Sequence, residues 1–220
     1  MRRVFGALAM VVAAAAACGG GAGGDADHPP TSRDATSGPT TDPGDFAGID
    51  AVTEEVSSTT PEGPDADRRA ADLIADVEAS IDARGFRTAS DLEEAGFVPM
   101  PGDPIHWYDA TAVEDGRTVD PERPEFVMAT ADRVLGVMFL ASGDETPPDP
   151  PGAPAARWHR HVWSAPVCLG HGGLVVVAVP SDGDGCPAGT EARTESPYMF
   201  HVWLVGDDPF AAEMGEHQHG

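Results

Sequence analysis

Histidine is the residue type whose placement in this sequence most clearly suggests chemistry. His159 and His161 form an H-x-H pair within a predicted strand, so both imidazoles project from the same face of that strand. Two imidazoles placed in this way can converge on one metal ion, with bonds of about 2.0–2.1 Å. His201 lies in a second apolar strand and is the best candidate for a third ligand, and His106 is the fourth. These residues are therefore candidate ligands of a transition metal, with zinc or copper as the candidate ions.

The same histidines are also compatible with roles that need no metal. Histidines in strands often pack against aromatic rings and donate one hydrogen bond to a backbone carbonyl, and an H-x-H pair also arises by chance. Acid–base catalysis without a metal would use the same side chains. Glu125 could serve as an oxygen ligand or as a hydrogen-bond acceptor behind a ligating histidine.

Two more histidines, His217 and His219, lie in a predicted flexible tail, residues 211–220. Such a tail is ordinarily just solvated, but paired histidines in a tail can also bind divalent ions weakly. Any measurement of metal binding to the folded part therefore has to exclude the tail.

The chain contains three cysteines, Cys18, Cys168 and Cys186. Cys168 and Cys186 flank a predicted strand, and an exported protein meets an oxidising environment, so we expect a disulfide between them. In the competing hypothesis, Cys168 is a metal ligand close to His161 and His171.

Residues 1–17 have the three parts of a secretory signal peptide: two arginines, an uncharged apolar run and a small-residue cleavage site before Cys18. The apolar run is shorter than the roughly 20 residues that span a bilayer. The segment Ala15-Ala16-Ala17-Cys18 resembles a bacterial lipobox, which implies that Cys18 carries a lipid and becomes the N-terminus. Ordinary cleavage at an A-x-A site is the alternative. We expect a protein held on the outer face of the cell membrane by this lipid.

Acidic residues dominate the composition: 37 Asp and Glu oppose 13 basic residues, all of them Arg, for a formal net charge of −24. Such a surface repels phosphate backbones and anionic lipid headgroups, which argues against nucleic acid as a partner and against electrostatic membrane binding. The acidity favours solubility, and adaptation to high salt is the minor alternative. The membrane is therefore expected as a partner only through the lipid, and no particular protein partner is indicated.

Residues 18–64 are predicted to be a disordered tether, because this segment is rich in Gly, Pro, Ser, Thr and Asp and has few apolar residues to bury. A single folded domain is expected from 65 to 210. Its first element is a helix, because Leu73, Val77 and Ile81 repeat at four-residue steps. Asp65 or Asp67 could cap the start of this helix, and Gly85 marks its end.

A second, short helix is predicted from the capping-box pattern Ser90-x-x-Glu93, with Gly96 at its end. The sequence pattern then changes to short runs of apolar and β-branched residues that are bounded by Pro, Gly or Asp, without long helical patterns between them. The predicted strands cover residues 126–128, 134–140, 158–163, 174–179 and 198–205. The expected fold class is α+β, with N-terminal helices followed by a mainly antiparallel sheet or small barrel.

Several short motifs together resemble a family of uncharacterised bacterial exported proteins. They are Gly96-Phe97-Val98, His106-Trp107, Arg123-Pro124-Glu125 and the strand His201-Val202-Trp203-Leu204. The resemblance covers roughly residues 96 to 210 and implies one fold for this region. It singles out His106, Glu125 and His201 but implies no reaction.

No nucleophile motif of the G-x-S-x-G or S-x-x-K type is present, so an enzyme is not the favoured interpretation, although the question stays open. The expected function is that of a non-catalytic cell-surface lipoprotein of unknown biochemical role, for which a transition metal bound by the histidines is the candidate ligand. A metal-dependent enzyme using the same histidines is one alternative. An interaction module whose histidines only pack is the other.

Overall fold

The structure is a computed structural model and describes residues 49–56, 63–141, 147, 150, 157–180 and 185–214. The predicted signal peptide, Cys18 and the tail residues His217 and His219 lie outside these ranges. The helices are α1 (Pro64–Arg84), α2 (Ala89–Glu94) and α3 (Ala110–Val113). The strands are β1 (Ala51–Glu55), β2 (Val98–Pro99), β3 (His106–Tyr108), β4 (Phe126–Ala129), β5 (Val134–Ala141), β6 (His159–Gly170), β7 (Val175–Ala178), β8 (Glu191–Glu195) and β9 (Tyr198–Trp203).

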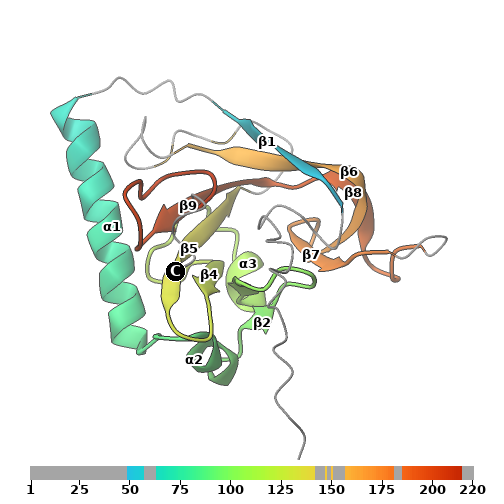
Figure 1. The fold of residues 1–220 in the computed structure, drawn as a ribbon, viewed down its shortest axis with the longest axis horizontal. Coiled ribbons are helices and arrows are strands. Elements are labelled where there is room, and N and C mark those ends of the chain that lie inside the picture. Colours follow the sequence, from blue (N-terminus) through green and yellow to red (C-terminus); the bar gives the residue numbers. More distant parts are fainter. Residues whose placement is uncertain are drawn as a thin grey trace, which may run out of the picture. The chain divides into compact units, whose positions relative to one another are not determined.

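The strands form one sheet in which every pairing between the described strands is antiparallel. Its main path runs β1-β6-β9-β5-β4-β3-β2, while β7 and β8 also pair with the long strand β6. The sheet curls into a half-barrel, with α1 beside β5 and β9 and the bend of β6 and β8 at the far end (Figure 1). The α+β class and the mainly antiparallel sheet are confirmed.

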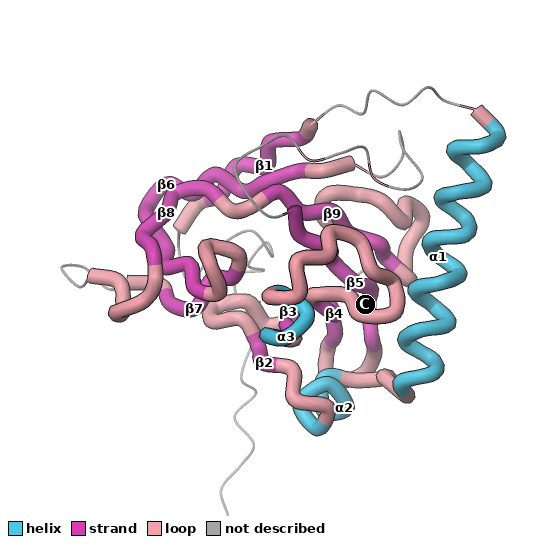
Figure 2. Tube along the Cα trace, turned by 180° about the vertical axis from the view of Figure 1, so that it is seen from behind, coloured by secondary structure: helices cyan, strands magenta, loops and turns pink. Residues whose placement is uncertain are grey.

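Helix α1 packs its apolar side against the outer face of the sheet. Leu73, Val77 and Ile81 are all buried, which confirms the predicted helix face. They belong to the same core cluster as Val137 and Phe139 of β5. Seen from behind, α1 again runs alongside the sheet next to β5 and β9 (Figure 2). This packing fixes the outer face and leaves the inner face of the curl for other side chains.

The ends of α1 differ in part from the prediction. The helix begins at Pro64, after Gly63, and proline suits the first helical position because its missing N–H would have no partner there. Asp65 and Asp67 lie in the first turn instead of capping it, where their charges favour the positive end of the helix dipole. Gly85 ends the helix as predicted, in the left-handed conformation with φ of 72°.

Helix α2 forms where expected but with a different cap. The N-cap is Thr88, whose backbone N–H donates to the Asp91 carboxylate at 2.8 Å. The predicted box of Ser90 and Glu93 is therefore wrong, because both residues already lie inside the helix. Threonine and aspartate at the same three-residue spacing form the box two residues earlier.

The inner face of the sheet carries a second core cluster, which includes Phe126 and Met128 of β4 and Met138 of β5. Side chains alternate along each strand, so neighbours on β9 go to opposite faces. Phe200 and Val202 pack on the outer side with α1, whereas Met199 and Trp203 pack on the inner side. His201, between Phe200 and Val202, therefore points to the inner face.

Strand β1 corrects the predicted extent of the tether. Residues 51–55 pair with β6 from Ala51 opposite Trp163 to Glu55 opposite His159. The predicted end of the tether at residue 64 is thus too late for this segment. The apolar residues of this segment do not predict a strand, because β1 is ordered by backbone pairing with β6 and not by burial of apolar side chains. Val52, for example, stays 65% exposed.

The segment after β9 also belongs to the folded core, although it was predicted to be part of a flexible tail from residue 211. Met214 is buried in the inner-face cluster. The indole N–H of Trp203 donates to the Ala211 carbonyl at 2.9 Å, which holds the returning chain against the end of β9. Within the described ranges, no helix is long and apolar enough to cross a membrane.

Candidate functional site

The four histidines predicted as metal ligands come together on the inner face of the sheet. Ring centroids are 5.8 Å apart for His106 and His201, 4.9 Å for His201 and His159, and 5.7 Å for His159 and His161. His106 lies on β3 and His201 on β9, with β4 and β5 between them in the sheet. Their contact is possible because the curl brings side chains of non-adjacent strands toward one another.

His159 and His201 are buried imidazoles without hydrogen-bond partners of normal geometry at either ring nitrogen. Their exposed fractions are 0% and 4%. The pKa of His159 is lowered to about 3, mainly by burial and also by His161 and His106, while the Arg157 carbonyl opposes the shift. Burial also lowers the pKa of His201 well below 6.5, with the other three histidines adding to the effect and the Ala212 carbonyl opposing it. Both rings are therefore neutral at pH 7, the state that binds metals.

His106 is oriented by a carboxylate. Asp103 accepts hydrogen bonds from the backbone N–H groups of Ile105 at 2.9 Å and His106 at 3.1 Å. Burial would raise the pKa of Asp103, but the attraction of His106 and these hydrogen bonds outweigh it, so the pKa is lowered. An ionised Asp103 only accepts, so His106 donates from Nδ1 to Oδ2 across 2.7 Å. The Nε2 atom of a neutral His106 then keeps its lone pair for a ligand.

His161 lies where β1 and the C-terminal segment meet. Thr53 is its direct partner in the β1–β6 register, and the Thr53 hydroxyl lies 3.4 Å from His161 Nδ1. The same hydroxyl donates a short hydrogen bond to the Glu213 carboxylate. Strand β1 and the segment after β9, both predicted to be flexible, thus contribute residues next to the candidate ligand His161.

A small cavity separates His106 from His161. Its volume is about 40 Å³, which is enough for an ion or a few water molecules. Most of its wall is apolar. Asp103 and the two histidines supply polar atoms, and Met100, Met138 and Met199 supply thioether groups.

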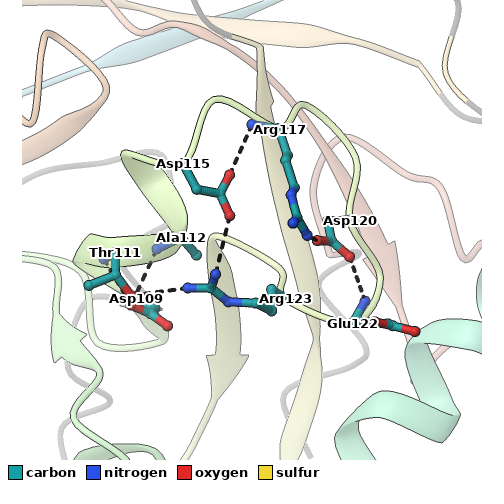
Figure 3. Close-up of polar contacts among 8 residues, drawn as sticks. All are labelled: Asp109, Thr111, Ala112, Asp115, Arg117, Asp120, Glu122 and Arg123. Atoms are coloured by element: carbon teal, nitrogen blue, oxygen red, sulfur yellow. Dashed lines mark hydrogen bonds and ion pairs between the residues drawn. The ribbon is translucent and has the colours of Figure 1, made fainter.

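Glu125, the candidate oxygen ligand or hydrogen-bond acceptor behind a ligating histidine, belongs to a different environment. It immediately precedes β4, and Phe126 points to the inner face, so alternation directs Glu125 to the other side. The charges that act on it are those of Asp115 and Asp120. These two belong to a network of arginine and aspartate contacts in the loop around α3 (Figure 3). Glu125 is therefore not part of the histidine cluster in this conformation.

Cys168 and Cys186 form the predicted disulfide, with 5.4 Å between their Cα atoms. The competing hypothesis, in which Cys168 is a metal ligand, is therefore wrong for this structure. His171, which that hypothesis also used, lies apart from the cluster in the turn after β6. Its ring packs on Tyr108, and its Nδ1 lies 2.8 Å from a Glu114 carboxylate oxygen.

The cluster is not a preformed metal cage. Across the described part of the chain, no three His, Cys, Asp or Glu side chains already surround a common point where an ion could sit. The sequence patterns indicate all four histidines but not Asp103, which the spacing Asp-x-x-His in a loop before a strand could have indicated.

No family model, no curated protein and no solved structure matches this chain. The likeness to exported bacterial proteins therefore stays a prediction.

Proposed function

We propose that this protein binds a transition-metal ion through His106, His159, His161 and His201, outside the cell membrane to which a lipid on Cys18 attaches it. The observation that carries the proposal is the pair His159 and His201. Each is a buried neutral imidazole without a hydrogen-bond partner of normal geometry. An unsatisfied buried polar group costs about 1–3 kcal/mol. A bound ion would satisfy these nitrogens and offset that cost.

The spacing of the rings supports the proposal. When two imidazoles bond one tetrahedral ion at about 2.0–2.1 Å, their ring centroids lie about 5 Å apart. The three centroid separations in the structure, 4.9, 5.7 and 5.8 Å, are close to this value. The rings would have to turn for their nitrogens to meet at a shared ion, because no three described ligand side chains surround one here. Asp103 behind His106 is the kind of outer partner that metal-ligating histidines have.

A metal-dependent enzyme is the second candidate, and the Asp103–His106 pair beside the cavity favours it. A carboxylate that orients an imidazole toward an open space is also how general bases are built. Ser196, the hydroxyl that lines the same cavity, donates to the Pro197 carbonyl and is therefore not poised as a nucleophile. Catalysis would require a substrate in a cavity of this small size, so binding of an ion is the better-supported function.

Replacing His201 by leucine is expected to remove metal binding without lowering the stability of the metal-free protein. The reason is that leucine fills the buried position and leaves no unsatisfied nitrogen. Thermal unfolding with and without Zn²⁺ should show a rise in melting temperature for the parent that follows the free Zn²⁺ concentration. The His201→Leu variant should show no such rise. If these histidines only pack, the substitution should instead lower stability equally with and without metal.

The background and the control both come from this chain. Every protein compared in the metal-binding experiments carries Cys18→Ser, His217→Ala and His219→Ala, which remove the lipidation cysteine and the tail ligands. We call the full-length protein with these three substitutions alone the reference variant. His171→Ala is the matched control, because His171 has an acidic hydrogen-bond partner and an aromatic neighbour but lies outside the cluster. It should keep the full Zn²⁺ effect.

Attachment through Cys18 has its own test in the unmodified chain. Protein extracted from membranes of the producing cells should begin at a lipid-modified Cys18, as measured by intact mass. The Cys18→Ser variant should be recovered in the soluble fraction. An unmodified Cys18, or a mature N-terminus elsewhere, would contradict the proposal of a lipid anchor.

A further inference from the structure

Three of the four histidines have a methionine directly opposite them on a neighbouring strand. The registers pair His106 with Met128, His201 with Met138 and His159 with Met199. Side chains that are directly opposite in an antiparallel pair share a face, with Cβ atoms about 4.5–5.5 Å apart. Each of these imidazoles therefore has a thioether group as its cross-strand neighbour.

The three methionines are buried with the histidines. Met128, Met138 and Met199 are 0%, 2% and 7% exposed and belong to the inner-face cluster. Met138 and Met199 also line the cavity between His106 and His161. Two of the thioether groups, Met138 and Met199, thus border the same small, mostly apolar space as two of the imidazoles, His106 and His161.

Filling of apolar volume does not account for this distribution. Methionine is a common filler of irregular cores. The outer-face cluster under α1 is equally buried, yet none of its described members is a methionine. All the methionines in the described ranges lie instead in or against the inner-face cluster: Met100, Met128, Met138, Met199 and Met214. Three of these five, Met128, Met138 and Met199, lie directly opposite a histidine.

We propose that the ion bound here is a soft monovalent metal, Cu(I), held by thioether sulfur from Met128, Met138 and Met199 together with the histidine nitrogens. The inference rests on the proposed function and specifies its ion. Neutral thioether groups are soft ligands that select Cu(I), whereas Mg²⁺ and Ca²⁺ need oxygen ligands and Zn²⁺ prefers imidazole, thiolate or carboxylate. Asp103, the carboxylate that lines the cavity, is already hydrogen-bonded to His106. Sulfur ligands also reduce the number of imidazoles that must converge on one point.

The test compares metals in the reference variant and in a Met128→Leu, Met138→Leu, Met199→Leu variant of it. Leucine nearly conserves the volume of methionine, so the fold should persist. Affinities are measured by competition with a Cu(I) chelator, by titration with Ag(I) as a redox-inert soft ion, and by titration with Zn²⁺. We expect the substitutions to weaken Cu(I) and Ag(I) binding by more than the roughly 10–100-fold that loss of an outer-shell partner costs. Zn²⁺ binding should be unchanged.

Met214→Leu is the matched control, because Met214 packs in the same cluster but has no histidine opposite it on a strand. It should leave all three affinities unchanged. X-ray absorption at the copper edge of the Cu(I)-loaded reference variant should show sulfur scatterers. This readout needs no substitution, so it decides the question even if the triple variant does not fold.

The outcomes separate this inference from the proposed function. A copper spectrum with nitrogen ligands alone would overturn the thioether site while the histidine site stands. The same holds if the triple variant binds Cu(I) and Ag(I) as tightly as the reference variant does. A loss in Met214→Leu as large as in the triple variant would overturn the assignment to the cross-strand methionines. Failure of the reference variant to bind any of the three ions would overturn both proposals.

Discussion

Between pH 4.5 and pH 8, the free energy of unfolding of the Glu125→Gln variant is expected to fall by about 4 kcal/mol less than that of the parent. Burial raises the pKa of Glu125 from 4.5 to about 8, with the charges of Asp115 and Asp120 adding to the shift. Between these two values the folded protein holds a proton that the unfolded chain has already released. The free energy of unfolding of the parent therefore falls by about 1.4 kcal/mol per pH unit from this group. This contribution is fully present below pH 4.5 and is lost as the pH rises through about 8.

Denaturant unfolding of parent and variant at several pH values between 4.5 and 8 measures this difference. The effect of Glu125 is best separated above pH 6.5. Below that pH the buried histidines, whose pKa values are lowered, also make the free energy of unfolding fall as the pH drops. Glu122→Gln is the control, since it removes a carboxylate of the same loop. Parallel pH curves for the parent and Glu125→Gln would show that Glu125 ionises normally in the folded protein.

Alanine at position 136 is expected to destabilise the protein by about 3 kcal/mol or more, through a clash between backbones. A Cβ on Gly136 would overlap the Val202 carbonyl oxygen and lie 3.0 Å from the Trp203 Cα. Neither atom can rotate away, so β5 and β9 would have to separate. The same two strands place Met138 opposite His201, and stabilisation by metal should therefore fall as well.

Thermal and denaturant unfolding of Gly136→Ala, with and without metal, checks this expectation. Gly185→Ala is the control, because among the described residues no atom beyond its chain neighbours lies within 4 Å of the added Cβ, and the backbone there is not left-handed. It should change stability by less than about 0.5 kcal/mol. Equal stabilities of the two variants would mean that β5 and β9 are not as close at this point as the register requires.

The elements that could be predicted from the sequence are those whose pattern is local. Leu73, Val77 and Ile81 mark a helix face by their spacing alone, and the apolar runs of β5 and β9 are readily recognised as strands. Strands β1 and β8 could not be found in this way. Their residues, AVTEE and EARTE, carry no apolar alternation, and both gain order only by pairing with β6.

The candidate site shows the same division. The H-x-H spacing placed His159 and His161 on one face, and the apolar strand around His201 suggested a buried ring that needs a partner. The approach of His106 depends on the curl of the sheet across β4 and β5, which no local pattern encodes. Glu125 was a candidate because a carboxylate can bind a metal or support a ligating histidine, but strand alternation directs it away from the cluster. The cross-strand methionines depend on register, which is also non-local.

Metal content after equilibrium dialysis decides whether the histidine cluster holds an ion. The reference variant and a variant of it with His106, His159, His161 and His201 all replaced by glutamine are dialysed against Zn²⁺ in one experiment and against Cu(I) under anaerobic conditions in another. The bound metal is then measured by elemental analysis. We expect one ion per chain for the reference variant in at least one of these experiments, and none for the glutamine variant, with circular dichroism confirming that both are folded. Equal metal content in the two proteins would contradict a metal site, and the four histidines would then serve only as packing residues.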